Sequence, residues 1–221
     1  MKIGIMDSGI GGITTLRRLM SVVGGDYVFV RDRLCPYGDK DDGFILSRTF
    51  AACEKLKQHG AELIVLACNT ATSVAVRALR EQDKAFSYIG IEPAVKPALL
   101  GCDKAAVILT PATARQDKFK LLIKSEGDRL KIVTPPALAP QIEKSFFDPK
   151  EMARLAAEVY SECKGYDGVV LGCTHYIFLK DYLYGLDYKL KIFDGNDGVA
   201  RRVLSLVGKQ GDPSVRFIEI G

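Results

Sequence analysis

The sequence predicts an α/β fold of two similar domains, each built on a parallel sheet and related by a pseudo-twofold axis, with a functional site in the cleft between them. Strand-like and helix-like segments alternate along the chain, which is typical of parallel sheets covered by helices on both faces. Three strand-like segments of the first half also recur in the second half. The 221 residues, of which 48% are hydrophobic and 26% charged, suffice for one large or two small globular domains.

The first half of the chain alternates in a regular order. Residues 2–6 form an apolar run that ends in the glycine-rich turn at residues 7–12, after which Ile13, Leu16 and Leu19 recur at helical spacing. The continuous apolar run at residues 63–67 has the composition of a buried strand. The other expected elements are strands at residues 27–30 and 88–91 and helices at residues 44–59 and 72–81.

The second half repeats the first. The segment around Cys68 aligns with the segment around Cys173, an offset of 173 − 68 = 105 residues. Two further strand ends recur at nearly the same offset, residues 3–7 as residues 106–110 and residues 89–92 as residues 191–194. Repetition of whole segments at one spacing indicates two related structural units. The polar groups at their strand ends are therefore expected to face each other.

Charge and composition exclude several classes of protein. Lys and Arg exceed Asp and Glu by 31 − 27 = 4, and the basic residues are scattered, so no patch is expected to bind nucleic acid or a membrane surface. No apolar run approaches the roughly 18 residues that span a bilayer, and the N-terminus lacks a signal-peptide layout, so we expect a cytoplasmic protein. Its six cysteines are expected to be reduced, and without a C-x-x-C motif no metal site is expected.

Polar and thiol side chains follow the predicted strands. Ligands of open parallel sheets bind beyond the carboxyl ends of the strands, where loops and helix N-termini supply N–H donors. The residues at such positions are Asp7, Ser8, Cys68, Asn69, Thr70, Glu92, Thr110, Thr113, Cys173, Thr174 and His175. We expect them to line one interdomain cleft.

Cys68 and Cys173 are the candidate chemical groups. Each follows an apolar strand and precedes two polar residues and a helix, whose dipole is expected to lower the thiol pKa from about 8.5. One such cysteine alone is more often a small core residue, but two at equivalent positions of a repeat favour catalysis. Two thiols on opposite sides of a carbon atom can remove a proton from one face and return a proton to the other. This chemistry is two-base racemisation or epimerisation.

Neighbouring residues are expected to assist the thiols. His175 is placed to orient or polarise Cys173, and Asp7 to act in the same way near Cys68, although helix capping is an alternative role for Asp7 and Ser8. Donors that could stabilise the developing charge of a substrate carboxylate lie at Ser8, Asn69, Thr70, Thr113 and Thr174. No lysine has a recognisable pyridoxal-binding context, Ser8 lacks the G-x-S-x-G elbow of a hydrolase, and the glycines after it do not form G-x-G-x-x-G.

The motifs around these residues resemble, in chain order, the signature segments of the glutamate racemases, within the aspartate/glutamate racemase superfamily. They are Asp7-Ser8-Gly9-Ile10-Gly11-Gly12, Pro36-Tyr37-Gly38, Ala67-Cys68-Asn69-Thr70-Ala71, Ile91-Glu92-Pro93, Thr110-Pro111-Ala112-Thr113 and Gly172-Cys173-Thr174-His175-Tyr176. The resemblance extends over essentially the whole chain.

The resemblance implies cofactor-independent interconversion of L- and D-glutamate, which supplies D-glutamate for bacterial peptidoglycan. By this analogy Cys68 and Cys173 are the catalytic pair, and Asp7 and His175 assist them. The implied substrate contacts are Ser8, Pro36, Tyr37, Gly38, Asn69, Thr70, Thr113 and Thr174, with Glu92 and Thr110 as a possible layer behind them. The resemblance also implies a first domain of residues 1–93 and 206–221, a second domain of residues 94–205, and a homodimer.

Other functions remain open. An aspartate racemase or a broader amino-acid racemase of the same superfamily fits the same residues. A non-catalytic amino-acid-binding protein would keep the cleft without needing both thiols, and a cysteine hydrolase would leave the second thiol unexplained. The basic segment at residues 31–35 is one residue shorter than the usual loop of the family, which bears on selectivity. Since the matching motifs contain no Arg or Lys, main-chain amides and hydroxyls are expected to hold the distal carboxylate of the substrate.

Overall fold

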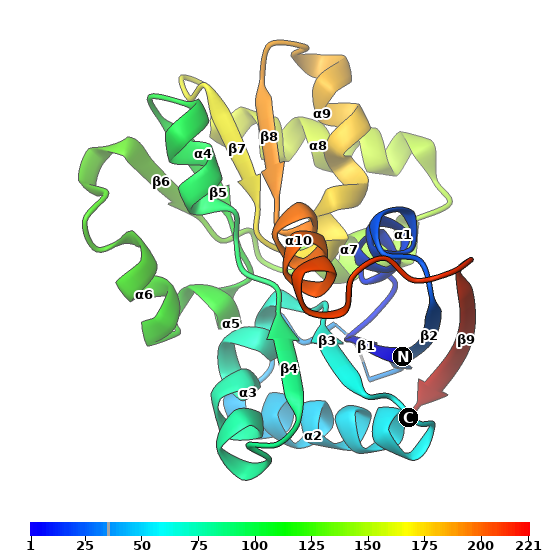
Figure 1. Cartoon of the computed structure of the whole chain (residues 1–221). Coiled ribbons are helices and arrows are strands. Elements are labelled where there is room, and N and C mark those ends of the chain that lie inside the picture. Colours follow the sequence, from blue (N-terminus) through cyan, green and yellow to red (C-terminus); the bar gives the residue numbers. More distant parts are fainter. Residues whose placement is uncertain (35) are drawn as a thin grey trace.

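The strands form two separate sheets in the computed structural model, which describes residues 1–34 and 36–221. Every pairing in both sheets is parallel. The first sheet has the strand order β4-β3-β1-β2-β9, and the second has the order β6-β5-β7-β8 (Figure 1). The strands of the first sheet are β1 (Lys2–Asp7), β2 (Asp26–Asp32), β3 (Leu63–Leu66), β4 (Ser87–Gly90) and β9 (Ser214–Ile220). Those of the second are β5 (Ala105–Ile108), β6 (Leu130–Val133), β7 (Gly168–Leu171) and β8 (Lys191–Asp194).

The strand order confirms the repeat that the sequence predicts. The aligned segments correspond to the pairs β1 and β5, β3 and β7, and β4 and β8. In the first sheet these strands follow the order β4-β3-β1-β2, and the second sheet has the equivalent order β8-β7-β5-β6. The first sheet is extended by β9, which pairs with β2. The fold class of two similar parallel-sheet units is therefore confirmed.

Helices cover both faces of each sheet. In the first lobe, α1 (Ile13–Val22) and α10 (Asn196–Val207) pack on one face, and α2 (Asp42–Gln58) and α3 (Asn69–Gln82) pack on the other. In the second lobe, α4 (Val95–Gly101) and α6 (Asp117–Ile123) pack on one face, and α7 (Leu138–Ser145), α8 (Pro149–Cys163) and α9 (Lys180–Leu186) on the other. Because both faces are covered, the central strands β3, β5 and β7 contain no polar side chain. Three short helical segments complete the chain: α5 (Pro111–Ala114), η1 (Gly127–Arg129) and η2 (Thr174–Leu179).

The two units differ in how the end of the chain is used. Val199, Ala200 and Val203 of α10 belong to the same apolar cluster as Ile3 and Ile5 of β1. This helix therefore lies with the first lobe. The division at residues 93/94 and 205/206 stays a prediction, and the packing of α10 favours a boundary just before Asn196 instead of after residue 205.

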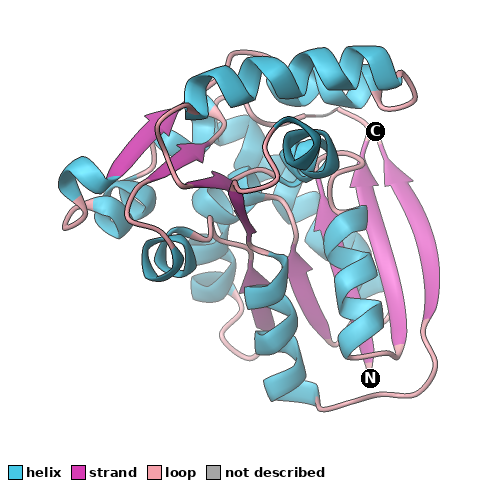
Figure 2. Ribbon diagram, turned by 90° about the horizontal axis from the view of Figure 1, so that it is seen from above, coloured by secondary structure: helices cyan, strands magenta, loops and turns pink. Residues whose placement is uncertain are grey.

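The chain termini lie at opposite ends of the first sheet (Figure 2). The chain starts at the beginning of β1 and finishes at the end of β9, and the strands between them run parallel. Within the described parts of the chain, no helix combines the length and the apolar character needed to cross a membrane. The carboxyl ends of β1, β3, β5 and β7 all point toward the junction of the two lobes, and the polar turns that follow them form the candidate site.

Candidate active site

Asp7 ends β1 and is completely buried. Its Oδ1 atom accepts a hydrogen bond of 2.8 Å from the backbone N–H of Gly9. The turn needs glycine at position 12, because a Cβ atom there would lie 2.5 Å from the Cβ atom of Asp7. Burial raises the pKa of Asp7 from 3.8 to about 6, although the charge of His175 and the hydroxyl of Thr174 lower it in part. Asp7 is thus a carboxyl group whose charge is sensitive to its surroundings.

Cys68 ends the run of β3 and caps α3. Its Sγ atom accepts a hydrogen bond of 3.4 Å from the backbone N–H of Ala71 and lies 3.3 Å from the Oγ atom of Ser8. This cap explains why α3 begins at Asn69, earlier than the expected residue 72. Burial and, to a smaller extent, the negative charge of Asp7 together raise the pKa of the Cys68 thiol to about 12. The expectation that the helix dipole lowers this pKa is wrong, because burial outweighs the N–H donors.

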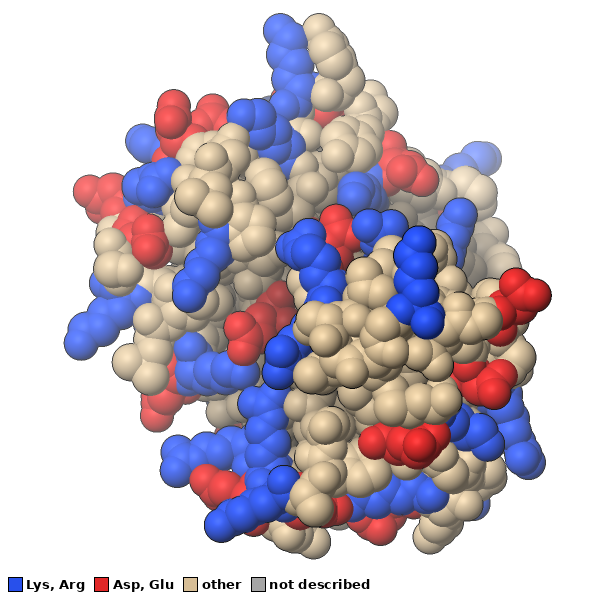
Figure 3. Space-filling model, in the orientation of Figure 1, with Lys and Arg blue, Asp and Glu red and all other residues tan. Residues whose placement is uncertain are grey.

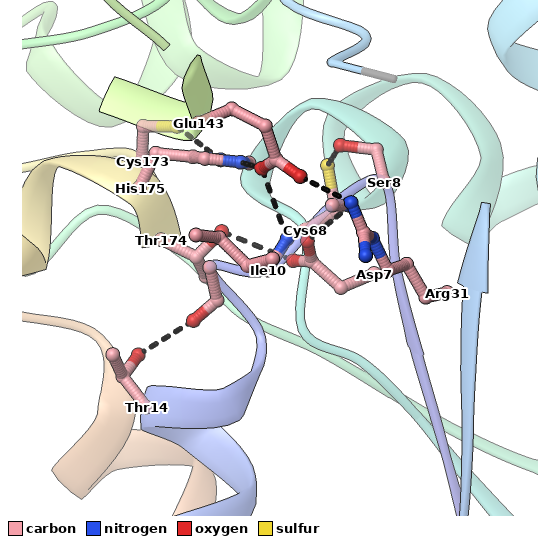
Figure 4. A network of polar contacts seen from close by, with 12 residues as sticks. Asp7, Ser8, Ile10, Thr14, Arg31, Cys68, Glu143, Cys173, Thr174 and His175 are labelled. Carbon is pink, nitrogen blue, oxygen red and sulfur yellow. Dashed lines mark hydrogen bonds and ion pairs between the residues drawn. The ribbon is translucent and has the colours of Figure 1, made fainter. Parts of the chain in front are cut away.

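Cys173 lies in a different electrostatic environment. It follows β7 and precedes the 3-10 helix η2, and its Sγ atom is 3.9 Å from Nδ1 of His175. Nε2 of His175 lies 2.5 Å from Oε2 of Glu143 in α7 (Figure 4). Burial alone would lower the pKa of His175, but the contacts with Cys173 and Glu143 and the charges of Cys173 and Asp7 raise it to about 10. His175 is therefore a cation at neutral pH, and this cation faces the sulfur atom of Cys173.

Glu143 is a site residue that the sequence analysis missed. Besides contacting His175, its carboxylate accepts a hydrogen bond of 3.1 Å from the backbone N–H of Ile10 and one of 2.6 Å from Nη2 of Arg31. Burial raises the pKa of Glu143, but these donors and the charges of His175 and Arg31 outweigh burial and hold it below its usual value. No signal in the sequence marked it, because it lies within a helix and not at a strand end.

The two strand-end thiols belong to one site. Thr174, next to Cys173, donates a hydrogen bond of 3.0 Å from its hydroxyl to Oδ2 of Asp7 in the other lobe (Figure 4). Cys68 contacts Ser8, which directly follows Asp7, and the charge of Cys173 is among the causes that raise the pKa of Cys68. Each thiol is nearly buried, with 4% of Cys68 and 6% of Cys173 exposed. Both are free thiols, as are Cys53, Cys102 and Cys163 elsewhere in the described chain.

Three threonine hydroxyls join the lobes beside the thiols. The Oγ1 atom of Thr70 lies 2.9 Å from that of Thr110 and 3.3 Å from that of Thr113, and the last two are 2.9 Å apart. All three side chains are buried. Thr70 follows Cys68 in the first lobe, whereas Thr110 and Thr113 follow β5 in the second. This cluster is a preformed group of hydrogen-bonding hydroxyls at the junction.

The loop at residues 36–38 reaches the same junction. The carbonyl of Gly38 accepts a hydrogen bond of 2.9 Å from the N–H of Ala112. A Cβ atom added at Gly38 would lie only 2.9 Å from Cγ2 of Thr110. The hydroxyl of the buried Tyr37 donates to Asp32, whose carboxylate also accepts from Nε and Nη2 of Arg48 at 2.7 and 2.8 Å. This ion pair, which the sequence analysis missed, fixes the loop. Pro36 is half-buried, and Asn69 and Ser8 are buried.

The sequence of the chain matches a known protein family. The model of the Asp/Glu/Hydantoin racemase family matches residues 36–202. The chain belongs to the Asp/Glu/hydantoin racemase family.

Individual members of the Asp/Glu/hydantoin racemase family are similar over nearly the whole chain. The glutamate racemase of Halothermothrix orenii is 37% identical, with 100% of this chain and 93% of that protein covered. The glutamate racemase of Clostridium perfringens strain SM101 is 38% identical, with 91% of this chain and 81% of that protein covered. Among solved structures, glutamate racemase from Francisella tularensis in complex with D-glutamate has a TM-score of 0.79 and 26% identity, with 99% of this chain and 87% of that chain covered. Glutamate racemase from Aquifex pyrophilus has a TM-score of 0.78 and 29% identity, with 100% and 90% covered.

One predicted site residue of this racemase-family chain lies apart from the thiols. The carboxylate of Glu92 is half-exposed and pairs with Lys118 at 2.6 Å. It borders a cavity of about 510 Å³ between the lobes, whose basic lining residues are Arg80, Lys96, Lys180, Arg201 and Arg202. Figure 3 shows Lys and Arg side chains along the junction of the lobes on this face. Apart from Pro36 and Asn69, for whose side chains the structure gives burial alone, the contacts described above connect the other predicted residues, Thr110 included. Among the described residues, no group of three or more His, Cys, Asp or Glu side chains is arranged to hold a metal ion.

Proposed function

We propose that this chain interconverts L- and D-glutamate by two-base proton transfer between Cys68 and Cys173. One observation carries the proposal: two buried thiols follow equivalent strands of the two lobes, and the Thr174–Asp7 hydrogen bond joins the turn that contains Cys173 to the turn whose Ser8 contacts Cys68. The names of the similar proteins, which are glutamate racemases, support the choice of substrate. The product D-glutamate would serve the synthesis of bacterial peptidoglycan.

The two thiols are suited to opposite roles in one turnover. We assign the role of base to Cys173, whose sulfur atom faces the His175 imidazolium, and in this role it accepts the α-proton of the substrate. The burial of Cys68 keeps its proton on sulfur, so this thiol can donate a proton to the opposite face of the same carbon atom. The turnover leaves Cys173 as a thiol and Cys68 as a thiolate, and the other enantiomer of the substrate has formed. The reverse direction uses the same steps in the opposite order.

The carbanion that forms between the two proton transfers needs stabilisation. Removal of the α-proton moves charge onto the α-carboxylate, which then resembles an enolate. The hydroxyls of Ser8 and Thr174 lie beside Cys68 and Asp7, and N–H groups of the turns after β1 and β3 lie at the same junction. We assign the hydroxyls of Thr70, Thr110 and Thr113, which lie within hydrogen-bond distance of one another, to the distal carboxylate. Since both thiols are almost fully buried, we propose that the substrate enters through a movement at the junction of the lobes.

Incubation with amino-acid enantiomers in D₂O tests the proposal. The purified protein is given L-glutamate, D-glutamate, L-aspartate or D-aspartate without added pyridoxal phosphate or metal, and optical rotation and deuterium at Cα are followed. We expect both signals to change with glutamate. Aspartate lacks one methylene, a difference worth only ~1–3 kcal/mol in a pocket, so it is the informative competitor. A double Cys68→Ser, Cys173→Ser variant is the control, and no exchange with glutamate by the intact protein would reject the proposal.

We also propose that the enzyme is a cytoplasmic homodimer. This proposal is supported by the resemblance to the family, in which homodimers are common. Light scattering coupled to gel filtration measures the mass in solution directly. A mass equal to the 24.2 kDa of one chain would reject the dimer.

A further inference from the structure

Arg31 connects three segments of the molecule at the edge of the site. It is the penultimate residue of β2. Its Nη2 atom donates a hydrogen bond of 2.6 Å to Oε1 of Glu143 in α7 of the second lobe. Its Nη1 atom donates a hydrogen bond of 3.2 Å to Oε1 of Glu219 in β9. Arg31 and Glu219 are direct neighbours in the register of β2 and β9, so their side chains leave the sheet at adjacent points. One guanidinium group thus bridges the chain's last strand and the second lobe.

The contacts continue from Glu143 to a reacting sulfur. Oε1 of Glu143 contacts Arg31, whereas Oε2 contacts Nε2 of His175 and the N–H of Ile10 (Figure 4). The other nitrogen of the same imidazole, Nδ1, lies 3.9 Å from Sγ of Cys173. A glutamate side chain has three rotatable bonds, and its orientation is fixed when both carboxylate oxygens are held. The planar guanidinium is well suited to hold one oxygen of such a carboxylate.

We propose that Arg31 is a positioning residue for the Cys173 half of the reaction: it holds Glu143 so that Oε2 faces His175, and Glu219 holds Arg31 in turn. This inference rests on the proposed two-base racemisation. The link between Arg31 and Glu143 is the stronger one, since their side chains are 34% and 15% exposed. Glu219 is 50% exposed, so water weakens its pairing with Arg31.

The proposal has a kinetic signature that follows from the two-step reaction. Loss of Arg31 raises the barrier for proton transfer at Cys173 and leaves the barrier at Cys68 unchanged. For the enantiomer whose α-proton faces Cys173, the deuterium isotope effect on kcat/KM then rises. For the other enantiomer the isotope effect falls, because its own C–H cleavage at Cys68 becomes less rate-limiting. A general loss of structure would lower the rate without separating the two isotope effects.

The experiment measures kcat/KM for both enantiomers of glutamate, with hydrogen or deuterium at Cα, in the full-length protein. We expect Arg31→Gln to lower kcat/KM between about tenfold and a hundredfold, as a small misplacement of a catalytic group does. The fall must be equal in both directions, since the equilibrium constant between enantiomers is unity. The His175→Asn variant shows for which enantiomer the isotope effect rises and for which it falls. Arg31→Gln should change the two isotope effects in the same directions. Arg31→Lys should recover part of the rate, and Glu219→Gln should show a smaller change of the same sense.

Arg33→Gln is the matched control. Arg33 lies two residues further along the same basic segment, is 69% exposed, and its Nε atom is 4.0 Å from Glu219. This variant removes one positive charge from the same segment, and its rate and isotope effects should equal those of the unmodified protein. A rate loss in Arg31→Gln with unchanged isotope effects, or no rate loss, would overturn the inference alone. Absence of glutamate racemisation by the unmodified protein would overturn the proposed function and the inference together.

Discussion

The hydroxyl of Thr174 donates a 3.0 Å hydrogen bond to Oδ2 of Asp7, although the two residues are 167 positions apart. This bond joins the turn after β7 to the end of β1 and so connects the lobes. The approach is close enough that a Cβ atom at Gly11 would lie 2.4 Å from Oγ1 of Thr174. Asp7 thereby acts on both halves of the site, because its charge raises the pKa of Cys68 and also that of His175.

The carboxyl group of Asp7 makes the stability of the protein depend on pH. Burial raises its pKa from 3.8 to about 6 in the folded state. The folded state therefore binds the proton more tightly than the unfolded state does. The contribution of Asp7 to stability is most favourable below pH 3.8 and is lost as the pH rises through about 6. We expect Asp7→Asn to be more stable than the unmodified protein at neutral pH, by about 3 kcal/mol.

Chemical denaturation across the acidic range checks this prediction. The stability difference between Asp7→Asn and the unmodified protein should shrink as the pH falls to about 4, where Asp7 carries its proton. Asp197→Asn, which removes an exposed carboxylate that pairs with Arg18, is the control. A stability difference that does not change with pH would contradict the prediction.

Each of the two thiols should be indispensable. Cys68→Ser and Cys173→Ser should each lose nearly all racemisation of glutamate, because every turnover needs a proton acceptor on one face and a donor on the other. The controls are Cys53→Ala and Cys163→Ala, which replace one buried thiol of each lobe outside the site. Retention of more than about a tenth of the rate by either serine variant would exclude the two-base scheme. The rates are read by circular dichroism of the substrate.

The imidazole of His175 should remain protonated well above neutral pH. Its contacts with Cys173 and Glu143 raise its pKa from 6.5 to about 10. His59 is the only other histidine, so in a His59→Gln variant the imidazole NMR signals belong to His175 alone. We expect the doubly protonated form at pH 8, and a lower pKa after Glu143→Gln, which removes a negative charge from Nε2. Titration of His175 near 6.5 would be incompatible with the imidazolium at Cys173.

The threonine cluster should contribute more to binding than to catalysis. Thr110→Val removes the hydroxyl that lies 2.9 Å from both Thr70 and Thr113. We expect a stability loss of about 1 kcal/mol and a rise in the KM for glutamate that exceeds the fall in kcat. Thr49→Val is the matched control, because Thr49 is also buried but donates a hydrogen bond of 2.7 Å to the carbonyl of Ile45 within α2. An unchanged KM in Thr110→Val would show that this hydroxyl does not bind the substrate.

Much of the fold could be predicted from local patterns. Apolar runs followed by polar turns predicted the strands, and the aligned Cys68 and Cys173 predicted two equivalent sheets, which the strand order confirms. Such predictions succeed because a buried parallel strand must be apolar and its ligand-binding end must be polar. The expected start of α3 was late by a turn, since a cysteine was not considered as a helix cap.

The partners of the catalytic candidates could not be predicted. Glu143 contacts His175, and Arg48 contacts Asp32, only because of the way that α7 and α2 pack in the folded protein. The hydrophobic periodicity of the sequence does not predict such contacts.

The sequence by itself determined the paired sheets, the family, and the placement of two thiols at equivalent strand ends. Only the tertiary structure decided that Cys68 holds its proton while Cys173 faces a cation, and that α10 packs with the first lobe. The reason is physical: strand and helix patterns depend on neighbours along the chain, whereas the protonation of a buried group depends on the charges and the desolvation that the whole fold brings to it.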